Sequence, residues 1–278
     1  MIQATGLTKK YGKNTVVHDL SFHVEKGYVT GFLGPNGSGK STTMRMILGL
    51  DEPTRGQVLI DGKHYSEYIS PLKKVGALLD ASYITPGFTA QEHLTVAALS
   101  NNLDTNRVEE CLSLVGLENV GNKKIGGFSL GMKQRLGIAR ALLGDPEYLM
   151  FDEPNNGLDP EGIRWMRDFM RSLAEEGKAV FVSSHQISEL SKTADNVIVI
   201  GEGKMIADAT MKEFTRNFSE KIDVTVADED EKKMVLALRD LGATVEPAPT
   251  GFIVSGISAV KVGETARDLN IVLHQLAP

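Results

Sequence analysis

The chain lacks several features that mark particular classes of protein. Its 278 residues include one cysteine, Cys111, so no intrachain disulfide can form and the zinc sites built from several thiolates are excluded. Cys111 lies among apolar residues and is predicted to be a buried filler in a reducing compartment. No apolar run reaches the length of about 18 residues that crosses a bilayer, and the N-terminus lacks a signal-peptide core. A cytoplasmic chain, held to a membrane only by a partner, is expected.

An excess of positive charge is also missing. The sequence has 30 Lys and Arg residues against 36 Asp and Glu residues, which gives a net charge of −6. Proteins that bind nucleic acid usually present a basic surface, so no nucleic-acid partner is expected. Apolar residues at 41% and charged residues at 24% are the ordinary balance of a globular protein with a full core.

Short apolar runs alternate with amphipathic stretches over the first two-thirds of the chain. Strands apolar on both sides are predicted at 28–33, 148–151 and 179–182. Helices are predicted at 42–50, 107–114, 130–143 and 161–174. Trp165 belongs to the last helix and is expected to pack rather than to bind a ligand. Fully apolar strands between helices are typical of a parallel sheet, so this part is predicted to be an α/β domain.

The composition changes near residue 216. Residues 219–278 hold 10 acidic and 6 basic residues, and therefore most of the net negative charge. Strands are predicted at 222–226, 244–246, 252–254 and 271–273, with helices at 234–241 and 259–269. The order βαββαβ predicts a small ferredoxin-like α+β domain at 217–278, after a larger domain at 1–216.

Residues 34–42, Gly-Pro-Asn-Gly-Ser-Gly-Lys-Ser-Thr, fit the phosphate-binding pattern G-x-x-x-x-G-K-[ST] between a strand and a helix. Glycines let successive N–H groups turn inward around phosphate oxygens, and the helix N-terminus adds positive charge. Lys40 is predicted to reach the β- and γ-phosphates and Ser41 to ligate Mg²⁺. The predicted nucleotide-binding residues are Asn36, Gly37, Ser38, Gly39, Lys40, Ser41 and Thr42. The alternative is a glycine-rich turn with no ligand.

The strand at 148–151 ends in two carboxylates. Asp152 is predicted to hold the water shell of Mg²⁺, and Glu153 to orient or deprotonate an attacking water. An Asp-Glu pair after an apolar strand is a weak signal by itself. It gains strength in a chain that already has a phosphate-binding loop.

A further group of motifs makes the pattern specific. Ser129 is well placed as the N-cap of the helix predicted at 130–143. With the loop at 34–42, the segments 129–132, 152–154, 157–159 and 184–185 resemble, in order and spacing, the motifs of the ATP-binding subunits of ABC transporters. The resemblance covers about residues 2–215. It implies a P-loop NTPase core of the ABC ATPase type with a helical subdomain at about 86–145.

The resemblance implies roles for further residues. Tyr11 matches the aromatic residue that stacks on adenine, and His185 matches a histidine that contacts the γ-phosphate. Ser129 and Gly131 match the signature motif, which in the family contacts the γ-phosphate bound to the opposite subunit. Asp159 matches the loop that crosses the dimer interface. Two ATP molecules are therefore expected between two head-to-tail subunits, with a homodimer as the simplest arrangement.

Three features depart from the usual family pattern. The signature serine is followed by Leu130-Gly131-Met132 rather than Gly-Gly-Gln, and Asp80 replaces a glutamine, which makes it a candidate to reach Mg²⁺ through water. The C-terminal domain is the third departure. These features resemble the ATPases of bacitracin- and lantibiotic-type peptide exporters, whose tails tend to continue past the point that matches Pro278.

The resemblance implies an ATP-hydrolysing subunit of a bacterial exporter. It is expected at the inner face of the membrane, where it powers export of an antimicrobial peptide or drug through a separately encoded transmembrane permease and contributes to antibiotic resistance. One alternative is a soluble ABC ATPase acting on nucleic acid or the ribosome. The 89 residues between Lys40 and Ser129 show no heptads of the DNA-repair type, and the ribosomal type has two ATPase domains. The other is a non-hydrolysing regulator, which the presence of Glu153 and His185 disfavours.

Overall fold

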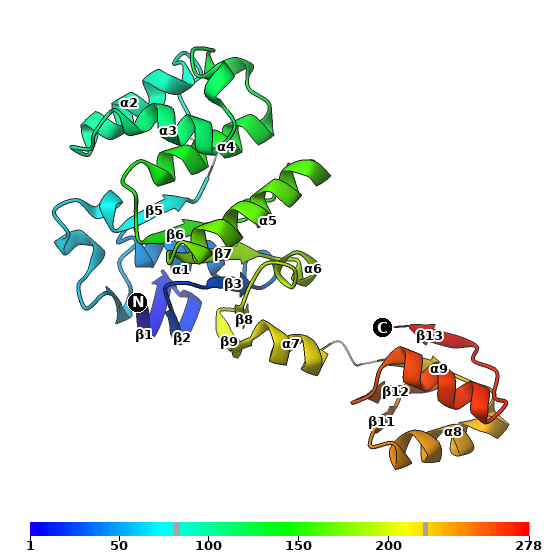
Figure 1. The fold of residues 1–278 in the computed structure, drawn as a ribbon. Helices are drawn as coiled ribbons and strands as arrows, with labels where there is room; N and C mark the ends of the chain where they lie inside the picture. Colours follow the sequence, from blue (N-terminus) through cyan, green and yellow to red (C-terminus); the bar gives the residue numbers. More distant parts are fainter. Residues whose placement is uncertain (81–83, 219–221, 278) are drawn as a thin grey trace. The chain divides into compact units, whose positions relative to one another are not determined.

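The computed structural model describes residues 1–80, 84–218 and 222–277 (Figure 1). The chain divides into two compact units, Met1–Met211 and Lys212–Pro278. The domain boundary proposed after residue 216 falls inside α7 (Met211–Phe218). None of the described helices is both long and apolar enough to span a bilayer.

A six-stranded sheet forms the centre of the first unit (Figure 1). In spatial order its strands are β5 (Val75–Leu78), β6 (Tyr148–Phe151), β7 (Ala179–Ser184), β3 (Val29–Leu33), β8 (Asn196–Gly201) and β9 (Lys204–Thr210). All neighbouring strands are parallel except β8 and β9, which form an antiparallel hairpin. Every residue of β3, β6 and β7 is buried, which confirms the fully apolar strands predicted from the sequence.

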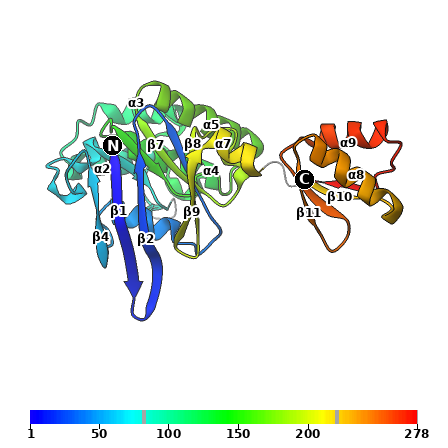
Figure 2. The ribbon, with the colours of Figure 1, turned by 90° about the horizontal axis from the view of Figure 1, so that it is seen from below.

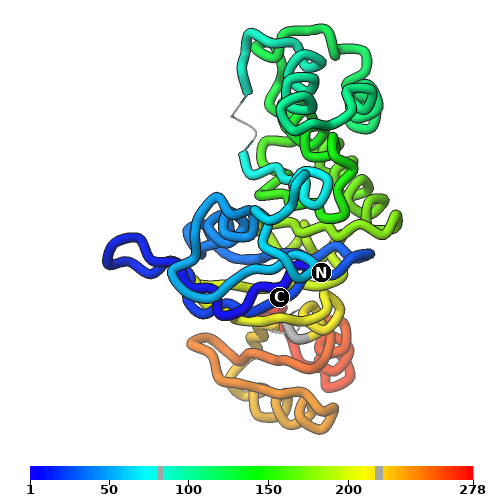
Figure 3. The backbone as a smooth tube through the Cα atoms, turned by 90° about the vertical axis from the view of Figure 1, so that its left-hand side faces the viewer, coloured from blue at the N-terminus to red at the C-terminus, as the bar shows by residue number. Residues whose placement is uncertain are grey.

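A second sheet is antiparallel and has the order β2 (Asn14–Val24), β1 (Ile2–Tyr11), β4 (Arg55–Ile60). The two sheets and α1 (Lys40–Ile47) share one hydrophobic core. Phe22 of β2 lies 5.8 Å, between ring centroids, from both Phe32 and Phe181 of the parallel sheet. Figures 2 and 3 show the tip of the β1–β2 hairpin projecting from the rest of this unit.

The opposite face of the parallel sheet is covered by α5 (Pro160–Glu175) and α6 (Ile187–Leu190). A Cβ at Gly31 of β3 would lie 3.0 Å from the Leu190 side chain, so α6 needs the glycine for close approach. Trp165 of α5 packs as predicted, stacked on Phe169 at 5.1 Å with the Arg135 guanidinium 4.1 Å above its ring.

Beyond the edge strand β5, three helices pack together: α2 (Ala90–Ser100), α3 (Arg107–Leu114) and α4 (Leu130–Leu142) (Figures 1 and 3). Cys111 is fully buried among them, and this burial raises the pKa of its thiol to about 11, so it is an inert filler as predicted. Four 3₁₀ turns complete the unit: η1 (Tyr65–Glu67), η2 (Pro71–Lys73), η3 (Glu118–Val120) and η4 (Ile125–Gly127).

The helix predicted at 42–50 is α1, which begins and ends earlier. Gly49 adopts a left-handed conformation with φ 64°, and its N–H donates to the Met46 carbonyl at 3.1 Å. This glycine ends the helix because a left-handed residue cannot continue it. Leu50, predicted inside the helix, is exposed in the following turn.

The second unit has the predicted βαββαβ order. Its elements are β10 (Ile222–Thr225), α8 (Asp228–Asp240), β11 (Thr244–Pro247), β12 (Phe252–Ser255), α9 (Ala259–Asp268) and β13 (Gln275–Ala277). The strands form an antiparallel sheet in the order β11-β12-β10-β13, with a core of its own against the two helices. This is the ferredoxin-like arrangement.

The last strand predicted for this unit was placed wrongly. Residues 271–273 are not a strand; β13 begins at Gln275. Asn270 is left-handed with φ 55°, and the Ile271 N–H donates to the Ala266 carbonyl at 2.8 Å, which closes α9. Ile271 is buried because an apolar residue packs against the end of the helix in this type of cap. Its hydrophobicity led to the wrong prediction of a strand.

A cluster of charges links the two sheets of the first unit. Lys74 Nζ lies 2.6 Å from Asp61 Oδ2 and 2.7 Å from Glu147 Oε1, and the Tyr148 hydroxyl donates to Asp61 Oδ1 at 2.7 Å. Burial alone would raise the pKa of Asp61, but hydrogen bonds from Lys74, the N-terminal amine and Tyr148 outweigh it and hold the pKa well below its usual range. Asp61 follows β4, whereas Lys74 precedes β5 and Tyr148 is the first residue of β6.

Replacing Asp61 with Asn is expected to lower the free energy of unfolding of the first unit by about 2 kcal/mol at pH 7. Because the folded pKa lies below the unfolded value of about 4, the carboxylate contributes fully above that pH, and its contribution is lost as the pH falls through the folded pKa. Urea titrations followed by the emission of Trp165, the chain's one tryptophan, measure this. A wild-type advantage over Asp61→Asn that stays constant from pH 7 to pH 3 contradicts the prediction.

Candidate active site

Three neighbouring parallel strands bring the predicted residues together. β6, β7 and β3 lie side by side, and the register pairs Leu33 of β3 with Ser184 of β7. Lys40, Glu153 and His185 follow the carboxyl ends of β3, β6 and β7, respectively. Loops at the carboxyl edge of a parallel sheet are the usual place for ligands in α/β proteins.

The Lys40 ammonium is at the centre of this group. Its Nζ donates to the carbonyls of Gly34 at 2.6 Å and Pro35 at 3.2 Å, and lies 3.3 Å from Glu153 Oε1. The side chain is only 6% exposed. A buried cation needs partners of this kind, because leaving it unpaired costs several kcal/mol, on the order of 3–5.

The Glu153 carboxylate lies between two nitrogen groups. Its Oε2 is 2.9 Å from His185 Nδ1, on the side away from Lys40, and the other ring nitrogen of His185 lies 3.3 Å from Gln186 Nε2. Glu153 has φ 48°, a left-handed conformation that costs a non-glycine residue about 1–2 kcal/mol. This turn aims the carboxylate into the group instead of continuing β6.

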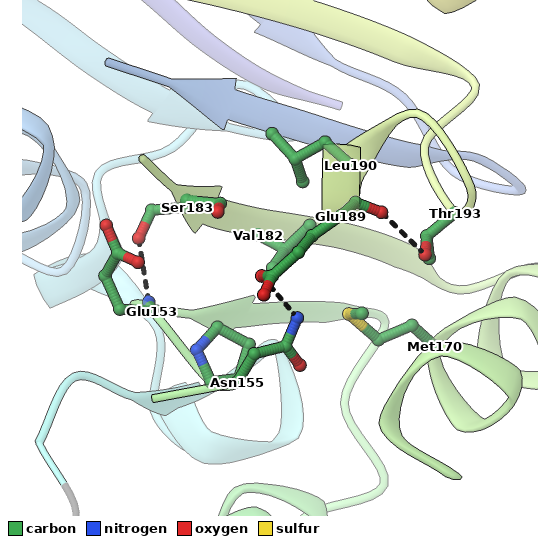
Figure 4. A pocket seen from close by; sticks show the side chains of 10 residues that line it. Glu153, Asn155, Met170, Val182, Ser183, Glu189, Leu190 and Thr193 are labelled. Atoms are coloured by element: carbon green, nitrogen blue, oxygen red, sulfur yellow. Dashed lines mark hydrogen bonds between the residues drawn. The ribbon is translucent and has the colours of Figure 1, made fainter. Parts of the chain in front are cut away.

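Sequence analysis missed Ser183, which bonds the Asp152 carboxylate and the backbone of Glu153. The Glu153 N–H donates to Ser183 Oγ at 2.8 Å (Figure 4). The Ser183 hydroxyl in turn donates to Asp152 Oδ1. Ser183 is fully buried on β7, next to β6. The sequence did hold a signal for Ser183, which is a hydroxyl directly after the apolar run at 179–182. Such a hydroxyl is buried with its strand and needs hydrogen-bond partners, which makes it a candidate contact near the site.

The pocket in Figure 4 lies beside Ser183 and is too small for a nucleotide. Its volume is about 10 Å³, close to that of one water-sized probe. Asn155 Nδ2 donates to Glu189 Oε2 across it at 2.8 Å. This contact fixes the loop after Glu153 to α6.

The glycine-rich loop has the shape of an anion cradle. Gly39 caps α1 with φ 100°, and a Cβ there would lie 2.7 Å from the Val16 carbonyl oxygen. Ser38 Oγ is buried and has no hydrogen-bond partner among the described residues. Asn36 and Gly37 are exposed at the turn of the loop. An orphaned hydroxyl, a buried ammonium and a helix N-terminus without a side-chain cap fit a phosphate group.

The three residues predicted to serve a metal line one cavity of about 550 Å³: Ser41, Asp152 and Asp80. Across residues 1–80, 84–218 and 222–277, no three His, Cys, Asp or Glu side chains are grouped to hold an ion by themselves. Mg²⁺ characteristically takes one or two protein ligands and completes its shell with phosphate oxygens and water. The residues present fit that mode. Thr42, next to Ser41, is half-buried.

Ser129, Gly131 and Asp159 lie apart from the Lys40 group. Ser129 accepts a hydrogen bond from the Met132 N–H at 3.3 Å and so caps α4, as predicted, while Asp159 caps α5 through Gly162 at 2.7 Å. Ser129 and Asp159 are exposed. Neither cavity described above has these residues in its lining.

The starts of these two helices contact each other. A Cβ at Gly157, before α5, would lie 2.1 Å from the Leu130 side chain, and one at Gly131 would lie 3.4 Å from Leu158. Gln134 of α4 donates to the Pro154 carbonyl at 2.9 Å. Leu130, the departure from the usual signature, therefore packs against the loop that follows Glu153.

Tyr11 lies at the end of β1, on the projecting hairpin. Its side chain is 48% exposed, and its hydroxyl donates to Asp51 Oδ2 at 3.0 Å. The ring therefore has open surface on which a flat group could stack.

Comparisons with known proteins agree with this arrangement. Residues 17–156 match the ABC transporter family. The bacitracin transport ATP-binding protein BcrA of Bacillus licheniformis is 41% identical over 85% of this chain and 78% of its own length. The lantibiotic transport ATP-binding protein SrtF of Streptococcus pyogenes is 36% identical over 75% of this chain and 90% of its own length.

Solved structures share the fold. A dimeric bacterial ABC transporter cassette superimposes with a TM-score of 0.69 at 27% identity, over 76% of this chain and 99% of that chain. A post-hydrolysis state of that cassette, bound to ADP and Pi, gives the same values. An ATP-binding subunit of an ABC transporter superimposes with a TM-score of 0.71 at 28% identity, over 79% of this chain and 93% of that chain.

Replacing Ser183 with Ala removes the hydroxyl that bonds the Asp152 carboxylate and the backbone N–H of Glu153. We expect kcat for the ATP hydrolysis predicted from the sequence to fall about tenfold, because small misplacements of reacting groups are costly. ATP affinity without Mg²⁺ is expected to stay within about twofold, since Lys40 and the loop are untouched. Steady-state turnover and equilibrium titration measure the two quantities. Ser172→Ala, on the exposed side of α5, is the control; equal losses in both variants would contradict the assignment.

Proposed function

Because this chain belongs to the ABC transporter family, we propose that it powers the export of an antimicrobial peptide through a separately encoded membrane subunit. It is an ATP-binding and ATP-hydrolysing subunit, in keeping with relatives that are themselves transport ATP-binding proteins. The family predicted from the motifs is confirmed. The cargo, the membrane partner, Mg²⁺ and the residue roles are our proposal.

One observation carries the assignment of the site: Lys40, Glu153 and His185 come together from the ends of three neighbouring strands. Glu153 Oε1 lies 3.3 Å from Lys40 Nζ, and Glu153 Oε2 lies 2.9 Å from His185 Nδ1. When ATP binds, the Lys40 ammonium would leave the Glu153 carboxylate and pair with the β- and γ-phosphates instead. This exchange leaves Glu153 free to orient or deprotonate water, while His185 holds the carboxylate on its other oxygen and faces the γ-phosphate.

The remaining residues support this chemistry. Ser38 and the loop N–H groups hold phosphate oxygens, and Tyr11 stacks on adenine. Ser41 and Asp152 would hold Mg²⁺, with Asp80 as a third candidate through water. When bound, the ion neutralises negative charge on the phosphates. Catalysis then rests on positioning and on charge complementarity, with no covalent step on the protein.

A second subunit completes the site in our proposal. Ser129, Gly131 and Asp159 cap or adjoin helix starts that are exposed, and none of the three lines either of the two cavities described above. A capped helix start is a second phosphate cradle. Relatives in the family include a dimeric cassette. We therefore assign these residues to the γ-phosphate and the interface of the opposite subunit in a head-to-tail homodimer.

The membrane subunit is proposed to dock over the cavity of about 550 Å³ that holds Ser41 and Asp152. His93 and Arg140, from α2 and α4, line its other side. A docked segment would therefore touch both the helical part and the nucleotide site, which couples hydrolysis to movement. With the membrane subunit docked in this way, we propose that the chain works at the inner face of the membrane.

The names of the relatives support the proposed cargo. Two of them are named for bacitracin and lantibiotic transport, and both antibiotics are peptides made by bacteria. A peptide antibiotic is thus the cargo class we propose. These relatives favour transport over the alternatives on nucleic acid, the ribosome or regulation.

Replacing Glu153 with Gln is expected to reduce ATP turnover at least a hundredfold, because the amide cannot accept a proton from water. ATP binding persists, and the variant accumulates as an ATP-bound dimer. Phosphate release and light scattering in the same samples measure turnover and mass. Glu175→Gln, an exposed carboxylate at the end of α5, should behave as wild type. A wild type that binds ATP without turnover in the presence of Mg²⁺ and its membrane subunit would support the regulatory alternative instead.

Expression with its membrane subunit in a susceptible bacterium is expected to raise the inhibitory concentration of bacitracin or a lantibiotic about fourfold or more. Lys40→Ala should abolish the increase, because it removes the cation that binds the phosphates. Growth inhibition across a panel of peptide antibiotics and unrelated drugs measures this. Protection against unrelated drugs alone would contradict the peptide cargo while leaving the ATPase assignment intact.

A further inference from the structure

The Tyr11 phenol is held in one orientation by a carboxylate from another part of the chain. Its hydroxyl donates to Asp51 Oδ2 at 3.0 Å, although the two residues are 40 positions apart. Asp51 lies just after the end of α1, and its side chain is 18% exposed. Tyr11 itself is 48% exposed, so packing alone does not fix the ring.

Asp51 is in turn fixed to the helix that carries the phosphate-binding residues. Arg45 Nε of α1 donates to the same oxygen, Asp51 Oδ2, at 2.7 Å, and the Leu50 N–H donates to the Arg45 carbonyl at 2.9 Å. The hydrogen bond from Arg45 lowers the pKa of Asp51, so the carboxylate remains ionised and accepts from the phenol. Tyr11 is thereby tied to the helix that begins at Lys40.

A cation occupies one side of the ring. Lys9 Nζ lies 5.0 Å from the centroid of the Tyr11 ring, in the range of a cation–π contact. Partial desolvation and the Asp51 carboxylate raise the pKa of Tyr11, which keeps the phenol protonated as a donor. Asp51 accepts the hydrogen bond of the Tyr11 hydroxyl, and Lys9 lies over one face of the ring. The other face can therefore stack on a flat ligand.

We propose that Asp51 is a positioning residue for adenine: it holds the Tyr11 ring in the stacking orientation and couples that orientation to α1 through Arg45. The inference rests on the proposed function. It deepens that function because it adds a residue, Asp51, that acts on the adenine end of the nucleotide through Tyr11. A ring ordered before binding loses less conformational entropy when a base stacks on it. Stacking on an aromatic ring stabilises a bound base by about 1–3 kcal/mol, so loss of its orientation is measurable.

The test compares a ligand that has the base with one that lacks it. ATP and inorganic tripolyphosphate are titrated into the full chain in EDTA, which prevents turnover, for wild type, Asp51→Ala, Tyr11→Phe and the double variant. Asp51→Ala is expected to raise the Kd of ATP about fivefold and to leave that of tripolyphosphate within about twofold. Tyr11→Phe, which keeps the ring and loses the hydroxyl, should reproduce most of this effect. Glu175→Gln is the control carboxylate, and Trp165 emission checks folding.

The double variant separates positioning from a general structural role. If Asp51 acts through the phenol, Tyr11→Phe with Asp51→Ala is no weaker for ATP than either single variant. Losses that multiply, an unchanged Kd for ATP in Asp51→Ala, or an equal loss for ATP and tripolyphosphate would each overturn the inference. A wild type that binds tripolyphosphate no more weakly than ATP would overturn it as well. A wild type that binds neither ligand would instead contradict the proposed function.

Discussion

The parallel pairing of β6, β7 and β3 is the constraint on which the site depends. It sets three loops next to one another, so that an ammonium, a carboxylate and an imidazole from distant parts of the sequence lie within hydrogen-bonding reach. The pairing also places the Ser183 hydroxyl beside the end of β6, where it binds Asp152 and the backbone of Glu153. Strand register therefore fixes the distances among these three groups, and the side chains need little freedom of their own.

Local patterns were sufficient to predict the three buried strands around the site and the order of elements in the second unit, but not the antiparallel β2-β1-β4 sheet. The apolar runs at 148–151 and 179–182 are buried strands, and the loop at 34–42 joins β3 to α1 as its glycines indicate. These predictions succeed because burial on both faces and a phosphate-binding turn each require particular residues in consecutive positions. The βαββαβ order of the second unit follows from the same reasoning.

Contacts between distant segments could not be predicted in this way. The partners of Ser183 are known only once β7 is placed next to β6, and Asp51 gains its contact with Tyr11 only when β1 approaches the end of α1. Ile271 was mistaken for a strand residue because an apolar helix cap and an apolar strand bury the same surface. The contacts of such residues depend on segments that are distant in the sequence, and a hydrophobicity pattern does not identify those segments.

The contact between Lys40 and Glu153 bears on whether the first unit needs a bound nucleotide in order to fold. A buried ammonium that relied on a ligand for its counter-charge would make the ligand a condition of folding, as zinc is for a zinc finger. Here two backbone carbonyls and a carboxylate of the same chain supply that counter-charge. The Lys40 ammonium therefore needs no nucleotide to be paired inside the folded first unit. In the function we propose, the free energy of nucleotide binding is then available for moving subunits against one another.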